Sequence, residues 1–549
     1  MNIDEIYKSW VENAHVPEIQ RELFKIKDNS EEKYERFYKS LEFGTAGIRG
    51  IMGAGTNRVN VYTVGRVTQG FASYLLKKFR NPSVAISYDS RIRSKMFAYL
   101  AARIMAANGV KVHLVCETQP TPFLSFAVRK LGCSAGVMIT ASHNPSQYNG
   151  YKCYGKDGAQ ITEEIAKEIY DEISKVDIFS GVKNMRIQQA FEEKQALFMN
   201  KNVVEEYLNC VTNQKINNTD FSHLNVVYTP LNGSGCKLVC KALEIIGVKN
   251  LKVVYEQKYP DGNFTTCRLP NPEYLDAFNL AIKYAVSSKA DIIIATDPDS
   301  DRMGVCARHK GEYKLVTGNQ IGILLFYYIV KKKREFIDST VRPVVVRSLV
   351  SSKMIDAIAK KENCEVISVP TGFKNIAKEI AKLESSGNLS SYLFGFEESN
   401  GYLSGTYARD KDAVSATVLM CEAAAYFKRN NLSLIDALAK ISERYGHYGE
   451  KNLSFEFKGS KGKEKMDKII SNFESLIPES MGVISVKKDF GMLSLELENK
   501  NEIVVRTSGT EPKLKVYILA HENSEKELSE KLNVLSESME KIINEFSGE

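Results

Sequence analysis

Residues 136–145 read Gly-Val-Met-Ile-Thr-Ala-Ser-His-Asn-Pro, and the segment continues through Tyr148-Asn149-Gly150-Tyr151-Lys152. The apolar run from Val137 to Thr140 predicts the end of a buried strand, and the turn-forming residues that follow end it. Ser142 is therefore expected on an exposed loop at the carboxyl end of that strand. Open α/β sheets bind their ligands at this edge, so the stretch predicts an α/β fold with a serine nucleophile.

The composition is that of an ordinary globular protein, with 43% hydrophobic and 26% charged residues among 549. That length predicts roughly three or four domains. The net charge of +7 is a small difference between 74 basic and 67 acidic residues. Because there is also no basic stripe interleaved with aromatic residues, we expect no nucleic-acid partner.

The ten cysteines are scattered singly, without a Cys-x-x-Cys pair, which favours reduced thiols over a zinc or redox site. The amino terminus is charged and lacks an apolar signal core, and no apolar run is long enough to span a bilayer. We therefore expect a cytoplasmic protein without a membrane partner.

Strands and helices alternate along most of the chain, which predicts mostly parallel sheets. After Asn430-Asn431 the pattern changes to alternating strands, which predicts a smaller domain of α+β type. The fold class is thus α/β, with three mixed α/β domains and a smaller C-terminal α+β domain. We place the domains at 1–198, 199–307, 308–436 and 437–549. The expected helices include 64–79, 95–107, 122–131, 236–246, 272–286, 318–330 and 413–429.

Asp297, Asp299 and Asp301 occupy alternate positions in a loop after the predicted strand 292–295. Three carboxylates converge only if something offsets their repulsion, and a hard divalent cation is the usual solution. An EF-hand is excluded because its sixth and twelfth positions here hold Arg302 and Arg308. A solvated acidic turn stays open as the alternative.

Three further loops carry candidate chemistry, and each also permits an ordinary surface turn. Phe43 to Gly50 surrounds Arg49 with glycines, which suits close approach of backbone to an anionic ligand. Gly395 to Gly401 places two adjacent carboxylates at a strand end, which suits recognition of sugar hydroxyls. Val504 to Lys513 has the composition of a phosphate cradle. Asp89-Ser90-Arg91 lies on the same predicted rim as Ser142 and is expected to support it.

Together these loops offer a serine nucleophile, a metal site, a site for sugar hydroxyls and a site for phosphate. With these motifs in this order, the chain closely resembles the α-D-phosphohexomutases, the phosphoglucomutase/phosphomannomutase enzymes. The segments 43–53 and 371–374 are most similar to the branch of longer bacterial phosphoglucomutases and eukaryotic phosphopentomutases. The resemblance implies four domains around a central cleft. It also implies that Ser142 carries the phosphoryl group and, with Asp297, Asp299 and Asp301, binds Mg²⁺. The residues that it assigns to catalysis and to the substrate are Arg49, His143, Lys152, Arg302, Thr371, Gly372, Glu397, Ser399, Lys411, Arg506, Ser508, Gly509 and Thr510.

The implied reaction interconverts glucose 1-phosphate and glucose 6-phosphate through a phosphoserine enzyme and glucose 1,6-bisphosphate. Lys152 is expected to take part in proton transfer, with a pKa that neighbouring cations lower. A histidine that some bacterial members place two residues after the serine of the sugar loop is Gly401 here, so its role does not transfer. Sugar phosphates are the expected partners, mannose and pentose phosphates are the rival substrates, and the sequence does not indicate an oligomeric state.

Two other functions remain open at this point. A phosphatase with Asp297 as nucleophile would release phosphate and would not need Ser142. A non-catalytic sugar-phosphate sensor would have no reason to retain a nucleophile.

Overall fold

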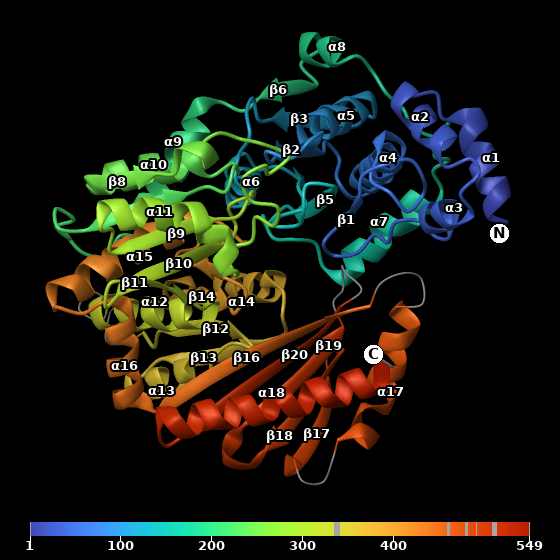
Figure 1. The fold of residues 1–549 in the computed structure, drawn as a ribbon. Coiled ribbons are helices and arrows are strands. Elements are labelled where there is room, and N and C mark those ends of the chain that lie inside the picture. Colours follow the sequence, from blue (N-terminus) through green and yellow to red (C-terminus); the bar gives the residue numbers. More distant parts are fainter. Residues whose placement is uncertain are drawn as a thin grey trace.

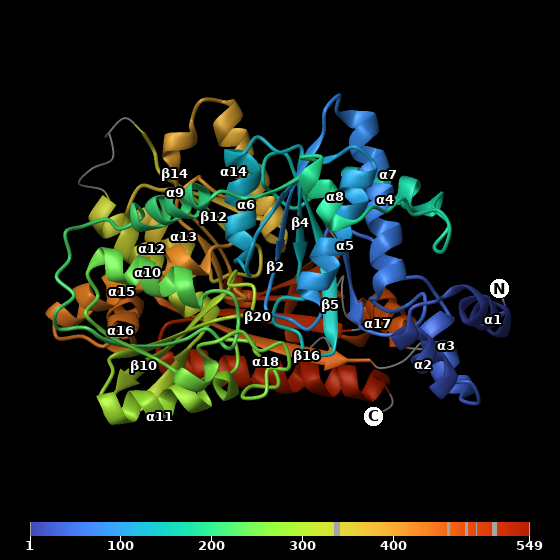
Figure 2. The ribbon, with the colours of Figure 1, turned by 90° about the horizontal axis from the view of Figure 1, so that it is seen from above.

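The computed structural model describes residues 2–333, 341–457, 462–477, 481–489, 491–507 and 513–547. Within these ranges the strands form four sheets, and the predicted mixed α/β class with several domains is confirmed (Figure 1). Among the described helices none is both long and apolar enough to cross a membrane. Figures 1 and 2 place α1 (Ile3–Asn13) at one end of the molecule and α16 (Leu434–Tyr445) at the other.

The first sheet has the strand order β1-β5-β4-β2-β3-β6. Its strands β4, β2, β3 and β6 run parallel, whereas β5 pairs antiparallel with β4, and β1 at the edge pairs antiparallel with β5. The five residues of β4 are all buried, because it lies between two other strands and under helix α6. The strands are β1 (Ile48–Ile51), β2 (Ser83–Tyr88), β3 (Lys111–Leu114), β4 (Ala135–Ile139), β5 (Tyr148–Gly155) and β6 (Ala196–Phe198). The helices are α2 (Pro17–Lys25), α3 (Ser30–Phe37), α4 (Val61–Lys78), α5 (Ser94–Ala107), α6 (Thr121–Lys130), α7 (Glu163–Ser174), α8 (Ile187–Glu192) and α9 (Lys201–Thr212).

The second sheet has the order β11-β10-β9-β7-β8, in which β8, β7 and β9 are parallel and β10 and β11 form an antiparallel hairpin. The helix expected over 272–286 begins later, at Asn279. Pro272 lies in a turn closed by the Tyr274 N–H and the Asn271 carbonyl, and a short 3₁₀ turn follows. The elements are β7 (Asn225–Thr229), α10 (Cys236–Ile246), β8 (Asn250–Val253), η1 (Tyr255–Gln257), η2 (Leu275–Phe278), α11 (Asn279–Ser288), β9 (Ile292–Thr296), β10 (Met303–His309) and β11 (Glu312–Val316).

The third sheet has the order β13-β12-β14-β15, with β13, β12 and β14 parallel. Helices α12 and α14 pack on β14, because both faces of this strand are apolar. The elements are α12 (Gly318–Lys333), β12 (Val344–Ser348), α13 (Met354–Lys361), β13 (Glu365–Val369), α14 (Phe373–Ser385), η3 (Leu389–Ser391), β14 (Tyr392–Glu397), β15 (Gly401–Leu403) and α15 (Ala413–Arg429).

The fourth sheet is antiparallel throughout, in the order β16-β20-β19-β18-β17, and α18 lies across one of its faces (Figure 1). Its alternating burial matches the alternating sequence pattern, as expected for a sheet with one covered face. The elements are β16 (His447–Glu456), α17 (Gly462–Leu476), β17 (Val483–Asp489), β18 (Met492–Leu497), η5 (Glu498–Lys500), β19 (Glu502–Thr507), β20 (Lys513–Glu522) and α18 (Glu525–Ser547).

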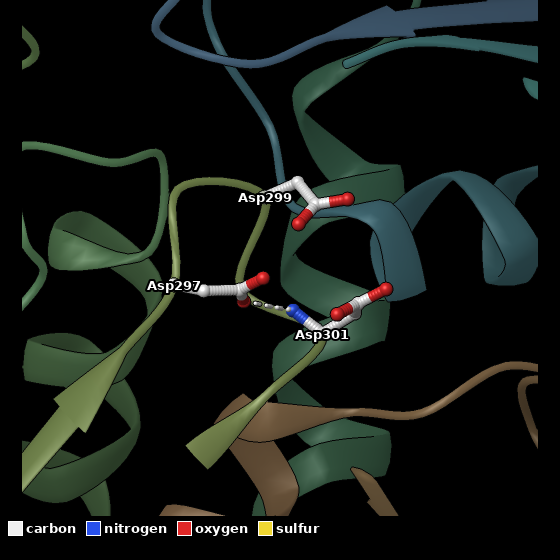
Figure 3. Close-up of side chains that lie close together, drawn as sticks. All are labelled: Asp297, Asp299 and Asp301. Atoms are coloured by element: carbon white, nitrogen blue, oxygen red, sulfur yellow. Dashed lines mark hydrogen bonds between the residues drawn. The ribbon is translucent and has the colours of Figure 1, made fainter. Parts of the chain in front are cut away.

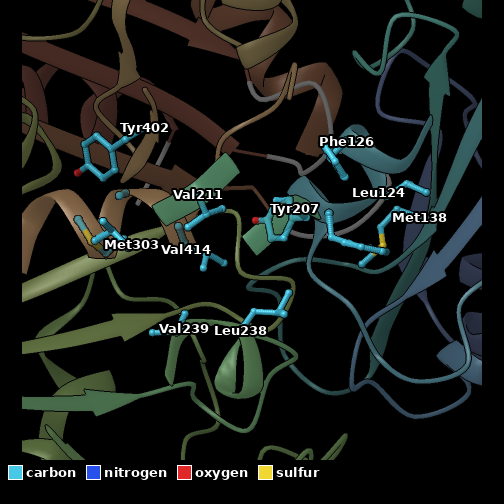
Figure 4. Close-up of a cluster of buried hydrophobic side chains, with 14 of the residues drawn as sticks. Leu124, Phe126, Met138, Tyr207, Val211, Leu238, Val239, Met303, Tyr402 and Val414 are labelled. Atoms are coloured by element: carbon cyan, nitrogen blue, oxygen red, sulfur yellow. The ribbon is translucent and has the colours of Figure 1, made fainter. Parts of the chain in front are cut away.

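One apolar core runs continuously through the first three sheets, so these domains are packed against one another rather than strung on linkers. Tyr207 of α9 lies in this core and donates a hydrogen bond to Asp412, just before α15, at 2.9 Å. Side chains of this core from all three sheets are drawn in Figure 4: Leu124, Phe126, Met138, Tyr207, Val211, Leu238, Val239, Met303, Tyr402 and Val414. This packing fixes the loops at the carboxyl ends of β4, β9 and β14 relative to one another.

Candidate active site

Ser142 lies directly after β4, and its φ of +54° is uncommon for a residue other than glycine. Its N–H donates to Oγ1 of Thr140 at 2.8 Å, and its hydroxyl donates to Oδ2 of Asp297 at 2.8 Å. Nδ1 of His143 lies 3.2 Å from the same hydroxyl oxygen. The expectation of an exposed serine is wrong. Ser142 is only 3% exposed, because the loop after β9 of the second sheet packs against it.

The carboxylates of Asp297, Asp299 and Asp301 converge in the loop between β9 and β10 (Figure 3). One oxygen from each lies within 4.8 Å of the others, and all three side chains are buried. Oδ1 of Asp297 accepts the backbone N–H groups of Asp301 and Arg302 at 3.1 and 3.0 Å, which folds the loop into a compact turn. A solvated acidic turn is therefore excluded.

Two oxygens of this cluster, Oδ1 of Asp299 and Oδ1 of Asp301, are buried and accept no hydrogen bond from the described residues. Buried carboxylate oxygens without donors are costly, and native structures rarely keep them. A hard divalent cation takes carboxylate oxygens as ligands and would satisfy both. The residues that the sequence singled out thus fit such a cation.

Lys152 projects from β5 into the same cluster. Its Nζ lies 2.8 Å from Oδ2 of Asp299 and 3.5 Å from Oδ2 of Asp301. Burial alone would lower the pKa of Lys152, but these two carboxylates outweigh it and the pKa is raised. Neighbouring cations do lower this pKa, as predicted, but the expected net lowering is wrong. The cations concerned, Lys411 and Arg49, have less influence than the carboxylates in direct contact.

The other titratable groups around Ser142 are shifted in different directions. Burial and the carboxylates of Asp299 and Asp301 raise the pKa of Asp297 well above its usual value. Burial acts in the same sense on Asp299, but contact with Lys152 lowers the pKa of that carboxyl. Burial lowers the pKa of His143 well below its usual value, so His143 is a neutral imidazole at neutral pH.

Residues 395–401, which the sequence assigned to sugar recognition (the sugar loop), lie against the acidic loop that carries Asp297, Asp299 and Asp301. The backbone of Arg302 forms an isolated antiparallel bridge with the last glycine of the sugar loop. Oε1 of Glu397 accepts the backbone N–H of Gly372 at 2.6 Å, and the hydroxyl of Ser399 donates to Glu398 at 2.9 Å. Segments far apart in the sequence are thus brought to one place.

Two cations tie the acidic cluster to its surroundings. Nζ of Lys411 lies 3.0 Å from Oδ2 of Asp301 and 3.4 Å from Oδ1 of Asp410. Nη1 of Arg302 lies 2.9 Å from Oε1 of Glu273. Sequence reasoning did not find Glu273, because it lies in an irregular segment whose only local signal is Asn-Pro-Glu before a short helical turn.

Arg49, in β1, approaches the serine loop from the edge of the first sheet. Its Nη1 donates to Oδ1 of Asn144 at 3.0 Å. The segment from Thr371 to Lys374 reaches the loop that precedes Arg49, since Nζ of Lys374 donates to Oγ1 of Thr45 at 3.1 Å. The third domain therefore contacts the Gly-rich loop of the first.

Of the predicted phosphate loop, Ser508, Gly509 and Thr510 lie outside the described residues. Arg506 is the last residue but one of β19, and its Nε and Nη2 donate to the hydroxyl of Tyr517 at 3.2 and 3.0 Å. Burial would lower the pKa of Arg506, but Tyr517 and Glu398 raise it. The guanidinium thus lies within electrostatic range of the sugar loop.

A serine hydroxyl beside three buried carboxylates that could hold a divalent cation, where two α/β domains join, suits metal-dependent phosphoryl transfer, whose catalysis consists largely of positioning and charge stabilisation. The chain matches the phosphoglucomutase/phosphomannomutase α/β/α domain I over residues 40–178, domain II over 205–311 and domain III over 317–445. It belongs to the phosphoglucomutase/phosphomannomutase family.

Relatives that are similar over most of their length support this assignment. The chain is 38% identical over 505 residues to a phosphoglucomutase of Staphylococcus haemolyticus, covering 88% of this chain and 90% of that one. It is 34% identical over 556 residues to a phosphoglucomutase of Staphylococcus aureus, covering 96% and 97%. The fold is similar to that of the solved Paramecium phosphoglucomutase parafusin, with a TM-score of 0.69 and 17% identity over 93% of this chain and 97% of that one.

Proposed function

We propose that this protein is a phosphosugar mutase that interconverts glucose 1-phosphate and glucose 6-phosphate, with Ser142 as the phosphoryl carrier. Its relatives at 34–38% identity are named phosphoglucomutases. The observation that carries the proposal is the 2.8 Å contact between the Ser142 hydroxyl and Asp297, beside two buried carboxylate oxygens that accept no hydrogen bond within the described part of the chain. Mannose and pentose phosphates remain the rival substrates.

Asp297, Asp299 and Asp301, together with an oxygen on Ser142, would hold Mg²⁺, which is the hard cation that such oxygen ligands favour. When bound, the ion supplies a positive charge that neutralises the phosphoryl group in transfer. Lys152 and Lys411 already contact the same carboxylates, at 2.8 and 3.0 Å. These lysines add positive charge to that of the ion.

In the proposed reaction the bond between phosphorus and Oγ of Ser142 breaks as a hydroxyl oxygen of the sugar phosphate forms a bond to the same phosphorus, and the proton of that hydroxyl ends on Oγ of Ser142. The product is glucose 1,6-bisphosphate, which reorients and returns its other phosphoryl group to Ser142. Because Lys152 has a raised pKa and contacts Asp299, we assign it to charge stabilisation rather than to proton removal. Arg49, which contacts the serine loop, has the same role.

His143 is the proposed proton acceptor when Ser142 recovers the phosphoryl group. Two acceptors reach the serine hydroxyl, Asp297 at 2.8 Å and Nδ1 of His143 at 3.2 Å. Since the proposal assigns Asp297 to the metal, Nδ1 of His143 is the other acceptor within reach of this hydroxyl, and it would take the proton and later return it.

The substrate's non-reacting end would be held by the remaining loops. The proposed phosphate ligands are Arg506, Arg302 and the backbone and hydroxyl groups of Ser508, Gly509 and Thr510, and the proposed hydroxyl ligands are Glu397 and Ser399 with the segment of Thr371 and Gly372. Arginine and consecutive N–H groups are well suited to bind phosphate, and carboxylates to bind vicinal hydroxyls.

We also propose domain boundaries at residues 198, 307 and 436 and a location in the cytoplasm.

The geometry disfavours a phosphatase that uses Asp297 as nucleophile. Its Oδ1 accepts two backbone N–H groups, and its Oδ2 accepts the Ser142 hydroxyl. Attack on phosphorus by Oδ2 would cost the contact with Ser142, whereas a mutase uses that contact. A non-catalytic sensor is tested by the assay below.

The test is to incubate the protein with glucose 1-phosphate, Mg²⁺ and a trace of glucose 1,6-bisphosphate, and to compare wild type with Ser142→Ala. We expect glucose 6-phosphate without net phosphate release, and collapse of this activity in the variant. Free phosphate as the main product would establish the phosphatase instead. If the protein turned over none of glucose, mannose or ribose 1-phosphate, the non-catalytic sensor would be the function that remains.

A further inference from the structure

The left-handed backbone at Ser142 needs groups that hold it, and one buried side chain contacts most of the loop. Arg91 lies just after β2, and its side chain is fully buried. Its Nη2 donates to the carbonyl oxygens of Ser142, at 2.6 Å, and of Asn144. Its Nη1 donates to the carbonyl oxygens of Pro145 and Tyr148 at 2.9 and 3.1 Å. One guanidinium thus binds four carbonyls of the loop that bears the nucleophile.

A second chain of hydrogen bonds holds the loop from its other end. Asp89, two residues before Arg91, accepts the hydroxyl of Thr140 at 2.6 Å, and Oγ1 of Thr140 in turn accepts the N–H of Ser142 at 2.8 Å. Oδ2 of Asp89 also lies 3.3 Å from Nε of Arg91. The pair Asp89 and Arg91 therefore binds both the N–H side and the carbonyl side of Ser142.

The second domain covers this pair. The ring of Phe264 faces the Arg91 guanidinium at 5.0 Å, and Phe264 is itself fully buried. A Cβ added at Gly262 would lie 2.4 Å from the backbone N of Ile92, so the loop 261–264 packs directly on the turn that carries Arg91. The same domain supplies Asp297, which the Ser142 hydroxyl contacts. Arg91 thus lies between the serine loop and the domain that bears the metal site.

We infer that Arg91 is a positioning residue for the phosphoryl transfer, one that fixes Oγ of Ser142 against Asp297 without touching substrate; this rests on the proposed function. Arginine suits the role because its planar fork offers several donors in fixed directions, whereas lysine has one ammonium that cannot reach four carbonyls. Within the described residues, which include only 504–507 and 513 of the phosphate loop, Arg91 has no hydrogen bond or ion pair with that loop or with the sugar loop. We therefore expect its loss to lower kcat and to leave KM nearly unchanged.

The variants Arg91→Lys and Arg91→Met test this, with Arg93→Lys as the matched control. Arg93 lies two residues further on, and its guanidinium pairs with Glu18 rather than with the serine loop. Since small misplacements of reacting groups reduce rates strongly, we expect kcat to fall about 100-fold in both Arg91 variants, with KM within about 3-fold of wild type. Arg93→Lys keeps wild-type kcat.

A purely structural role is separated from positioning by two further measurements. The folded fraction of each variant is determined by thermal unfolding, and kcat is expressed per folded molecule. Phe264→Leu keeps Arg91 but removes the ring over its guanidinium. We expect this variant to lower kcat about 10-fold with unchanged KM, because it weakens the hold of Arg91 on the serine loop less than the Arg91 variants do.

The inference is overturned if Arg91→Lys retains kcat within about 3-fold of wild type, or if the loss of kcat only follows the loss of folded protein. A rise in KM that accompanies the fall in kcat would also overturn the inference, because it would assign Arg91 to substrate binding. Failure of the proposed function shows in the wild type, which would then lack mutase activity. Failure of the Arg91 role shows only in the variants.

Discussion

Replacing Asp297 by asparagine is expected to stabilise the metal-free protein while abolishing its stabilisation by Mg²⁺. The amide fits the observed contacts. Its Oδ1 keeps the N–H groups of Asp301 and Arg302, and its NH₂ donates to the Ser142 oxygen in place of the present bond. What the substitution removes is one of three carboxylates whose oxygens lie within 4.8 Å of one another.

The magnitude follows from that spacing. Above the raised pKa of Asp297, where all three carboxylates are ionised, two unit charges 4.8 Å apart repel by about 3–4 kcal/mol at an effective dielectric constant near 20, and removing one carboxylate removes two such repulsions. The lost attraction to Arg302 and the weaker acceptor strength of an amide offset most of this gain. We expect a net gain of about 1–2 kcal/mol, which is a rise of a few degrees in midpoint for the domain concerned.

The assay is thermal unfolding of wild type and Asp297→Asn, first in a chelator and then in Mg²⁺. A ligand present at 100 times its dissociation constant stabilises the folded state by about 2.7 kcal/mol, so the wild-type midpoint rises in Mg²⁺. The midpoint of Asp297→Asn is higher in chelator and does not respond. Equal responses to Mg²⁺ would refute the assignment of Asp297 as a ligand, and a lower midpoint in chelator would refute the repulsion argument.

Three further predictions concern other parts of the site and fold. Lys152→Gln removes a buried charge next to Asp299 and is expected to lower kcat at least about 100-fold with little change in KM, as measured by initial rates. Arg506→Gln is expected to raise KM for the sugar phosphate about 10-fold or more while Mg²⁺ binding, followed by calorimetry, is retained. Burial raises the pKa of Glu450 from 4.5 to about 7, so the ionised carboxylate destabilises the fold increasingly as pH rises through that interval. The unfolding midpoint of Glu450→Gln should therefore equal that of wild type near pH 4.5 and exceed it above pH 7.

The sequence predicted the elements that depend on local pattern. The bounds predicted for helices 236–246 and 413–429 are the observed ones. The sequence pattern of each helix is clearly apolar, on one face or throughout, and the sequence also marks where each helix begins and ends. The strand before Ser142 and the metal loop after 292–295 were also predicted, since an apolar strand followed by polar turn residues is a local signal. Asp297, Asp299 and Asp301 come together because one short loop carries all three.

What the sequence did not predict depends on contacts between domains. Ser142 is buried because Asp297 of the second domain lies over it, and no local pattern encodes that packing. The raised pKa of Lys152 depends on which of several nearby charges it touches. Glu273 and Phe264 lie in irregular segments of the second domain, where hydrophobic periodicity carries no information.

The central claim is that Ser142 carries the phosphoryl group from one end of the sugar to the other. It is tested most directly by incubating the protein with glucose 1,6-bisphosphate and Mg²⁺, locating the phosphoryl group by peptide mass spectrometry, and then adding glucose 1-phosphate. We expect a single phosphoryl group on Ser142, which is discharged to the sugar without release of free phosphate. A phosphoryl group on Asp297, or a phosphoserine that only water discharges, would contradict it.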